Sequence, residues 1–252
     1  MVGAPRSKVE YVAQRLLDRI VASNLAPGMT LGTEAELLSQ YSVSRPTLRE
    51  SLRVLESQGV LDLRPGPKGG IRVAKPGMDI LAHGLSVYLR MHEVPFVAVL
   101  RAREVIEPAL AAEAAENGTV DEFDLMQASI DRMKTFSDQD KFIAENRVFH
   151  SLVAQASRNH VMAIFWSTIS IVAAGEEHGV QYTAGNQKRV IEAHESILEA
   201  FRRRDSAAAA ARMEEHVRAL EQLVKKSYKY LLNQATTIVA RDGRQVGALP
   251  RK

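Results

Sequence analysis

The chain has 252 residues, and its content of 46% hydrophobic and 25% charged residues is that of an ordinary globular protein. It contains no cysteine, which excludes disulfide bonds, cysteine-ligated metal sites and a thiol nucleophile. No apolar run is long enough to cross a membrane, and residues 1–15 lack the apolar core of a signal peptide. We therefore expect a cytoplasmic protein of one or two domains with no membrane partner.

The positive charge of the chain is concentrated in its first third. The net charge is +3, but residues 1–75 carry 11 Lys and Arg against 7 Asp and Glu, a net of +4. Residues 76–252 carry 22 against 23, a net of −1. A basic segment joined to a neutral one indicates a polyanionic partner for the first segment only.

Three helices are predicted at the N-terminus. Apolar residues between positions 9 and 21 recur with the 3.6-residue helical period. A second, short helix is predicted over residues 33–41, where Thr33 and Glu36 have the spacing of a capping box. Ser44 caps a third helix that ends at Gly59. Its predicted buried stripe consists of Leu48, Leu52 and Leu55.

Two short strands are predicted after the third helix, at residues 60–64 and 71–74, around a turn rich in Pro and Gly. Three helices followed by a hairpin are typical of a winged helix-turn-helix, which we place at residues 8–75. In that fold the third helix enters the major groove of DNA, and the hairpin approaches the backbone or the minor groove.

Three arginines, Arg45, Arg49 and Arg53, lie four residues apart on the face of the third helix opposite the leucines. The planar fork of arginine suits guanine edges and phosphates. The predicted DNA-contacting residues are Ser44, Arg45, Thr47, Arg49, Arg53 and, at the tip of the wing, Lys68. The alternative is a solvated face on which the arginines only pair with Glu50 and Glu56.

These residues resemble a known family. The segments 31–37, 43–56 and 58–60 are similar to the DNA-binding signature of the GntR family of bacterial transcription regulators. The resemblance implies that Arg45 and Arg49 bind operator DNA with help from the wing. Ala35 stands where the family often has a further DNA-contacting arginine, so an operator inferred from such relatives does not transfer to this chain.

After a linker at residues 73–77, only helices are predicted, which gives an all-α bundle of about seven helices over residues 78–232. The predicted spans are Met78–Met91, Val94–Glu116, Val120–Ser137, Asp140–Ser157, His160–Ala174, Asn186–Arg203 and Ser206–Asn233. Residues 234–252 are predicted to be a loose tail. The fold class is therefore mostly α.

Four of these helices place a polar residue on an apolar face, where it needs a partner. His150 lies four residues after Asn146 on one helix, and His194, His216 and Arg103 lie on three others. Imidazole suits Zn, Ni, Cu or Fe, and single ligands from several helices are a common way to build a metal site inside a bundle. The alternative is that each histidine is a core residue bonded to a backbone carbonyl.

A metal-dependent enzyme is a second hypothesis, because three histidines and a water also form catalytic zinc sites. Glu107 and Glu145 are near in sequence, but we expect no carboxylate beside the histidines that could serve as a general base. An enzyme would also leave the helix-turn-helix pattern unexplained. A ligand-responsive regulator is therefore favoured.

The second domain resembles the FCD ligand-binding domain of the FadR-type branch of the GntR family. The motifs that carry the resemblance are Arg103-x-x-Ile106-Glu107, Asn146-x-x-Phe149-His150, His194-x-x-Ile197 and Met213-x-x-His216. It implies that His150, His194 and His216 hold a divalent metal, Zn or Ni, together with Asn146 at the position of an aspartate. Because an amide is a weaker ligand than a carboxylate, metal binding is expected to be weakened or lost.

The resemblance also implies a small carboxylate effector, bound by Arg103 beside Asn146 and the three histidines. We expect a homodimer on roughly palindromic double-stranded operator DNA, and repression that the acid relieves.

Overall fold

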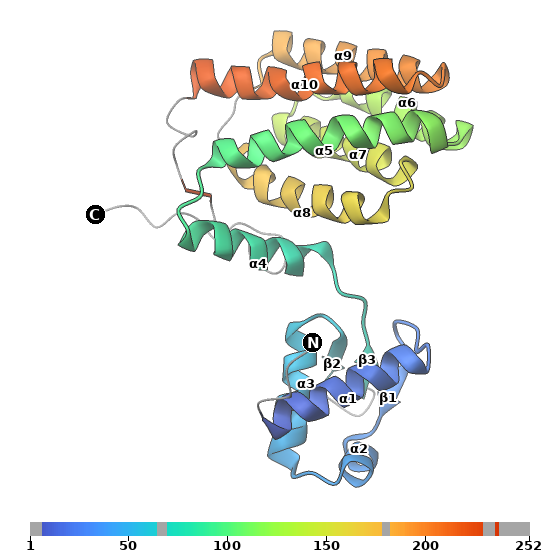
Figure 1. The fold of residues 1–252 in the computed structure, drawn as a ribbon, viewed down its shortest axis with the longest axis vertical. Coiled ribbons are helices and arrows are strands. Elements are labelled where there is room, and N and C mark those ends of the chain that lie inside the picture. The colour runs from blue at the N-terminus through green and yellow to red at the C-terminus, as the bar shows by residue number, and fades with distance from the viewer. Residues whose placement is uncertain (1–6, 65–69, 178–181, 229–234, 237–252) are drawn as a thin grey trace. The chain divides into compact units, whose positions relative to one another are not determined.

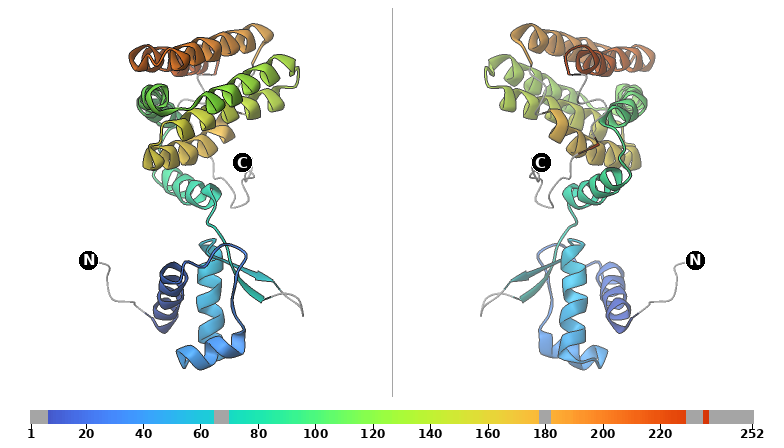
Figure 2. Two further views of the ribbon diagram at one scale, coloured as in Figure 1. Left: turned by 90° about the vertical axis from the view of Figure 1, so that its right-hand side faces the viewer. Right: turned by 90° about the vertical axis from the view of Figure 1, so that its left-hand side faces the viewer.

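The computed structural model describes residues 7–64, 70–177, 182–228 and 235–236. The chain divides into two compact units, Met1–Ile80 and Leu81–Lys252, and each is described by itself. Both are dominated by helices (Figures 1 and 2), so the predicted fold class is confirmed. No helix within the described ranges is long and apolar enough to span a bilayer.

The N-terminal unit is a winged helix-turn-helix. Its elements are α1 (Lys8–Ala22), β1 (Thr30–Gly32), α2 (Glu34–Tyr41), α3 (Arg45–Ser57), β2 (Leu61–Arg64) and β3 (Gly70–Val73). The three strands form an antiparallel sheet in the order β1-β3-β2. The sequence did not predict β1, because a three-residue strand with one buried side chain, Leu31, has no detectable alternation. Lys68 lies outside the described residues.

Local capping fixes the ends of the helices in this unit. Thr33 and Glu36 form the predicted capping box at the start of α2. The Ser44 side chain accepts from the backbone N–H of Thr47 at the start of α3. Gly59, just after α3, has φ of +71°, a conformation that other residues adopt only with strain. The predicted stripe of α3 is buried against α1 and the sheet, and it consists of Leu48, Leu52 and Leu55.

Over its described residues, the C-terminal unit has seven helices, as predicted. They are α4 (Met78–Met91), α5 (Phe96–Asn117), α6 (Val120–Thr135), α7 (Gln139–Ala156), α8 (His160–Glu177), α9 (Ala184–Arg202) and α10 (Ser206–Ser227). Helix α10 ends at Ser227, and residues 229–234 of its predicted continuation lie outside the described residues. Of the predicted loose tail only residues 235 and 236 are described, and they are not loose, because Ala235 pairs with Pro95 and Thr236 is buried. Long helices with buried apolar stripes account for the layered bundle seen in Figure 1.

Helix α5 is the centre of the bundle, since it contacts α7, α8, α9 and α10. Its buried stripe is interrupted by two charged residues, Arg103 and Glu107, which are 6% and 2% exposed. The largest apolar cluster joins α5, α6, α7, α9 and α10, and it includes Phe149 and Phe201. Of the polar residues predicted on apolar faces, Arg103, His150 and His194 are therefore buried in the core, whereas Asn146 and His216 are partly exposed.

Candidate DNA-contacting helix and candidate metal and effector site

The surface of α3 carries the predicted arginines. Arg45, Arg49 and Arg53 are all exposed, while the leucines on the opposite face are buried. Thr47 is half-buried, and its hydroxyl lies 2.9 Å from Ser44 Oγ. Ser44 therefore stabilises the first turn of α3, the turn that carries Arg45 and Thr47.

The three arginines differ in their partners. Arg49 Nε lies 3.1 Å from Glu34 Oε1 on α2, and Arg53 Nη1 lies 3.8 Å from Glu50 Oε2. Arg45 has no ion pair within the described part of the chain. Because exposed ion pairs contribute only about 0–1 kcal/mol, Arg49 can exchange Glu34 for a phosphate or a base at small cost.

The structure brings the three predicted histidines together from three helices. His216 Nε2 on α10 lies 3.1 Å from His150 Nε2 on α7 and 3.2 Å from His194 Nε2 on α9. One ring nitrogen from each residue lies within 4.8 Å of the other two. His194 also stacks on Phe149, with ring centroids 3.8 Å apart, which fixes the plane of its imidazole.

A carboxylate lies beside this cluster, contrary to our expectation. Glu107 Oε1 accepts from Arg103 Nε at 2.6 Å, and Glu107 Oε2 lies 2.5 Å from His150 Nδ1. Arg103 and Glu107 are four residues apart on one face of α5, so the helix itself places them side by side. Glu145, the other candidate in the sequence, points elsewhere and binds Ser129 and Arg132.

The electrostatics of the cluster favour neutral imidazoles at His194 and His216 next to an anionic Glu107. Burial raises the pKa of Glu107, but Arg103 and His150 together lower it by a larger amount. The pKa of Glu107 therefore lies well below the usual range of a glutamate. Burial, followed by the neighbouring His216 and His150, lowers the pKa of His194 well below its usual value. Burial and His150 lower the pKa of His216 to about 3. Neutral imidazoles offer the lone pairs that a metal ligand needs.

These donors fit a divalent metal. Two nitrogens held tetrahedrally by one Zn²⁺ at about 2.0–2.1 Å are about 3.4 Å apart, close to the contacts of His216. Asn146 Oδ1 and His194 Nδ1 are buried with no hydrogen-bond partner among the described residues. The Asn146 oxygen lies one helical turn before His150, and no hydrogen bond uses its lone pairs. A lone pair is therefore available to coordinate a metal ion.

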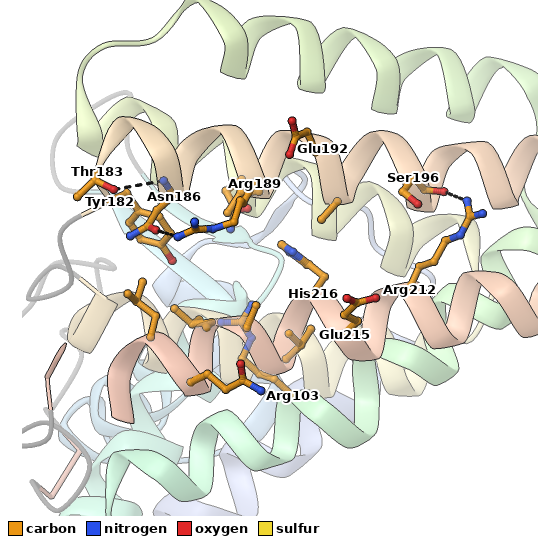
Figure 3. Close-up of a pocket in the computed structure, with 18 of the residues that line it drawn as sticks. Arg103, Tyr182, Thr183, Asn186, Arg189, Glu192, Ser196, Arg212, Glu215 and His216 are labelled. Carbon is orange, nitrogen blue, oxygen red and sulfur yellow. Dashed lines mark hydrogen bonds between the residues drawn. The ribbon is translucent and has the colours of Figure 1, made fainter. Parts of the chain in front are cut away.

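A pocket of about 850 Å³ adjoins the cluster. Its walls come from α5, α7, α9 and α10, and they include Arg103, Asn146 and His216. Figure 3 shows Arg103 and His216 directed into the pocket, with Arg189 entering from α9 toward Asn186. The volume is within the range of small-molecule sites.

The sequence alone missed two features of this region. Glu107 stands four residues after Arg103 on the same apolar stripe, and that spacing was a signal that could have identified it. Two exposed cations, Arg189 and Lys226, also line the pocket. Nothing in their local sequence marks them, because the pocket exists only once α9 and α10 are packed together.

The two units match two family models. Residues 8–73 match the gntR family of bacterial regulatory proteins, and residues 98–219 match the FCD domain.

Curated relatives share both units. An uncharacterized HTH-type transcriptional regulator of Bacillus subtilis, YcbG, is 28% identical over 222 residues, which are 88% of this chain and 91% of that protein. The HTH-type transcriptional repressor NanR of Escherichia coli K12 is 25% identical, covering 84% of this chain and 82% of its own. Among solved structures, a GntR protein of Streptococcus agalactiae superposes with a TM-score of 0.69 at 25% identity, covering 85% of this chain and 99% of its own.

These matches decide between the two functional hypotheses. The matched domains and relatives are those of transcription regulators, so the enzyme alternative is set aside. The chain belongs to the GntR family of bacterial transcription regulators and is of the FadR type, with an FCD domain after its helix-turn-helix.

Proposed function

We propose that this regulator is a repressor whose affinity for operator DNA falls when a carboxylate binds beside a divalent metal in the helical pocket. The observation that carries the proposal is the meeting of His150, His194 and His216 next to a pocket lined by Arg103. Metal and arginine together attract an anion, and they do so in a chain that also has a helix-turn-helix domain.

DNA recognition is assigned to α3 of two chains. In a homodimer, two copies of α3 would enter successive major grooves, about 34 Å apart along the duplex, so the operator would be roughly palindromic. Arg45 and Arg49, supported by Ser44 and Thr47, would contact base edges. Arg53, one turn further along α3, would contact a phosphate, and Lys68 would follow the backbone from the wing. The exposure of all three arginines supports this assignment.

The metal would be held by the three histidines, with Asn146 as a weaker fourth ligand. Zn²⁺ and Ni²⁺ both suit imidazole donors. When bound, the metal supplies positive charge to a carboxylate of the effector. The buried, partnerless oxygen of Asn146 supports its role as a ligand, although an amide stands where the family resemblance implies an aspartate.

The effector would bind through a carboxylate near Arg103 and the metal. A single small acid would fill little of the 850 Å³ pocket, whose other lining cations include Arg189, Arg212 and Lys226 against Glu192 and Glu215. An acid with further hydroxyl or anionic groups therefore fits the pocket better than acetate or a similar short acid.

The response to the acid requires that it bind two conformations of the protein with different affinity. We assign the DNA-releasing conformation to the acid-bound protein. The relative NanR is named a repressor, which supports the sign proposed for this chain.

The DNA-binding part of the proposal is tested by selection of full-length protein on a library of random duplexes. We expect enrichment of one roughly palindromic sequence, with half-site centres about 10 base pairs apart or a multiple of that spacing. Sedimentation of the complex should give two chains per selected duplex. Recovery of random sequences without enrichment would contradict the assignment, and one chain per duplex would contradict the homodimer.

A further inference from the structure

One carboxylate contacts both halves of the proposed metal and acid site. Glu107 has two oxygens with two different partners: Arg103 Nε at 2.6 Å from Oε1, and His150 Nδ1 at 2.5 Å from Oε2. It is 2% exposed, so water does not compete for either contact. No other carboxylate among the described residues touches the cluster.

The contact with His150 favours a proton on the ring nitrogen that faces Glu107. Glu107 Oε2 and His150 Nδ1 are at ion-pair distance, but the ring N–H direction does not make a hydrogen bond between them. A carboxylate oxygen 2.5 Å from an unprotonated ring nitrogen would bring two lone pairs together, so the contact favours the form with a proton on Nδ1. In a neutral imidazole the other nitrogen, Nε2, then carries a lone pair and no proton. His150 Nε2 lies 3.1 Å from His216 Nε2, and it therefore faces the other two histidines. Carboxylates behind metal-bound histidines act in this way in other metal sites.

The contact with Arg103 orients the other half of the site. Arg103 is 6% exposed and lines the pocket, and its Nε atom donates to Glu107. Since a guanidinium is planar, fixing Nε fixes the plane in which its remaining N–H groups point. The Glu107 side chain thus contacts both the His150 imidazole, which faces the other two histidines, and the Arg103 guanidinium, which faces the pocket.

We propose that Glu107 is a positioning residue that sets the tautomer of His150 for metal binding and the plane of Arg103 for binding a carboxylate. The proposal rests on the metal and acid site described above. It implies that metal and acid bind cooperatively, because both stabilise the same arrangement of Arg103, Glu107 and His150. By linkage, each ligand raises the affinity of the other by the same factor.

The test compares Glu107→Gln with Glu104→Gln in the full-length protein. Glu104 lies one turn earlier on α5 and pairs with Arg218, so its substitution removes a carboxylate from the same helix without touching the histidines. The amide of glutamine can donate to His150 Nδ1 and so favour the opposite tautomer. We expect Glu107→Gln to weaken Zn²⁺ binding in calorimetry by about 10–100-fold, and Glu104→Gln to change it little.

The tautomer is measured directly from the nitrogen NMR chemical shifts of His150. The wild-type protein without metal should carry the proton on Nδ1, and Glu107→Gln should move it to Nε2. Glu107→Asp, which keeps the charge, should keep the wild-type tautomer with intermediate Zn²⁺ affinity. If Glu107→Gln does not fold, the wild-type spectrum and the Glu107→Asp variant still test the role of Glu107.

Two results would overturn the role of Glu107: a proton on Nε2 in the wild-type protein, or equal Zn²⁺ affinity in wild type and Glu107→Gln. Absence of Zn²⁺ binding in the wild type would instead contradict the proposed metal site. In that case the spectrum still decides the contact between Glu107 and His150.

Discussion

Replacing Arg45 and Arg49 together with alanine should weaken binding to the selected duplex by about 2–6 kcal/mol. Each arginine that contacts a base is expected to contribute about 1–3 kcal/mol. Arg45→Ala should weaken DNA binding more than Arg49→Ala does, because Arg49 must break its ion pair with Glu34 before it contacts DNA. Fluorescence anisotropy at fixed ionic strength measures both, since the salt concentration alone changes such affinities by orders of magnitude.

Arg53→Ala is the matched control on the same helix. It removes another exposed arginine that lies deeper along α3, and its expected effect is less than about 1 kcal/mol. All three substitutions lie at the surface, so the thermal unfolding temperature should change little. Equal affinity of wild type and the double variant for the selected duplex would show that α3 is not the recognition helix.

Replacing His216 with alanine should lower Zn²⁺ affinity by about 3 kcal/mol or more, roughly a hundredfold. Four-ligand structural zinc sites bind with about 10–16 kcal/mol, and one ligand accounts for about a quarter of that. His216 contacts both other histidines, so its loss also opens the cluster. Calorimetry and the rise of the unfolding temperature with added Zn²⁺ measure the change.

His160→Ala serves as the control, because His160 is exposed at the first residue of α8 and is outside the cluster. Asn146→Asp should act in the opposite direction and tighten Zn²⁺ binding on the order of tenfold, about 1.4 kcal/mol. Without metal the same variant should be less stable than wild type, because it puts a charged oxygen where the buried Oδ1 of Asn146 has no hydrogen-bond partner among the described residues. If His216→Ala and wild type bind Zn²⁺ equally, the three histidines are core residues and hold no metal.

The helices could be predicted because their signals are local. Ser44 and Thr33 mark helix starts, Gly59 marks an end, and the 3.6-residue period of apolar residues identifies the buried face of each helix. Such signals depend on neighbours within one or two turns. They fail for β1, whose three residues are strand only because β3 pairs with them.

The sequence predicted which residues form the site better than it predicted the contacts between them. The histidines stood out because imidazole is conspicuous on an apolar stripe, and Arg103 because a permanent charge is costly there. The contacts of Glu107 with His150, and of Arg49 with Glu34, join different helices and depend on how those helices pack. Spacing within one helix cannot specify such contacts, although it does place Glu107 beside Arg103.

Control of DNA binding by an acid is tested by the fluorescence anisotropy of the selected duplex in the presence of full-length protein and Zn²⁺. This complex is titrated with four carboxylates: acetate, succinate, citrate and glucuronate. We expect that at least one acid that calorimetry shows to bind weakens the DNA complex tenfold or more, about 1.4 kcal/mol. Arg103→Lys, which keeps a cation beside Glu107 but removes the planar fork, should lose most of this response. Unchanged DNA affinity in the presence of every acid that binds the wild-type pocket would contradict the proposed function.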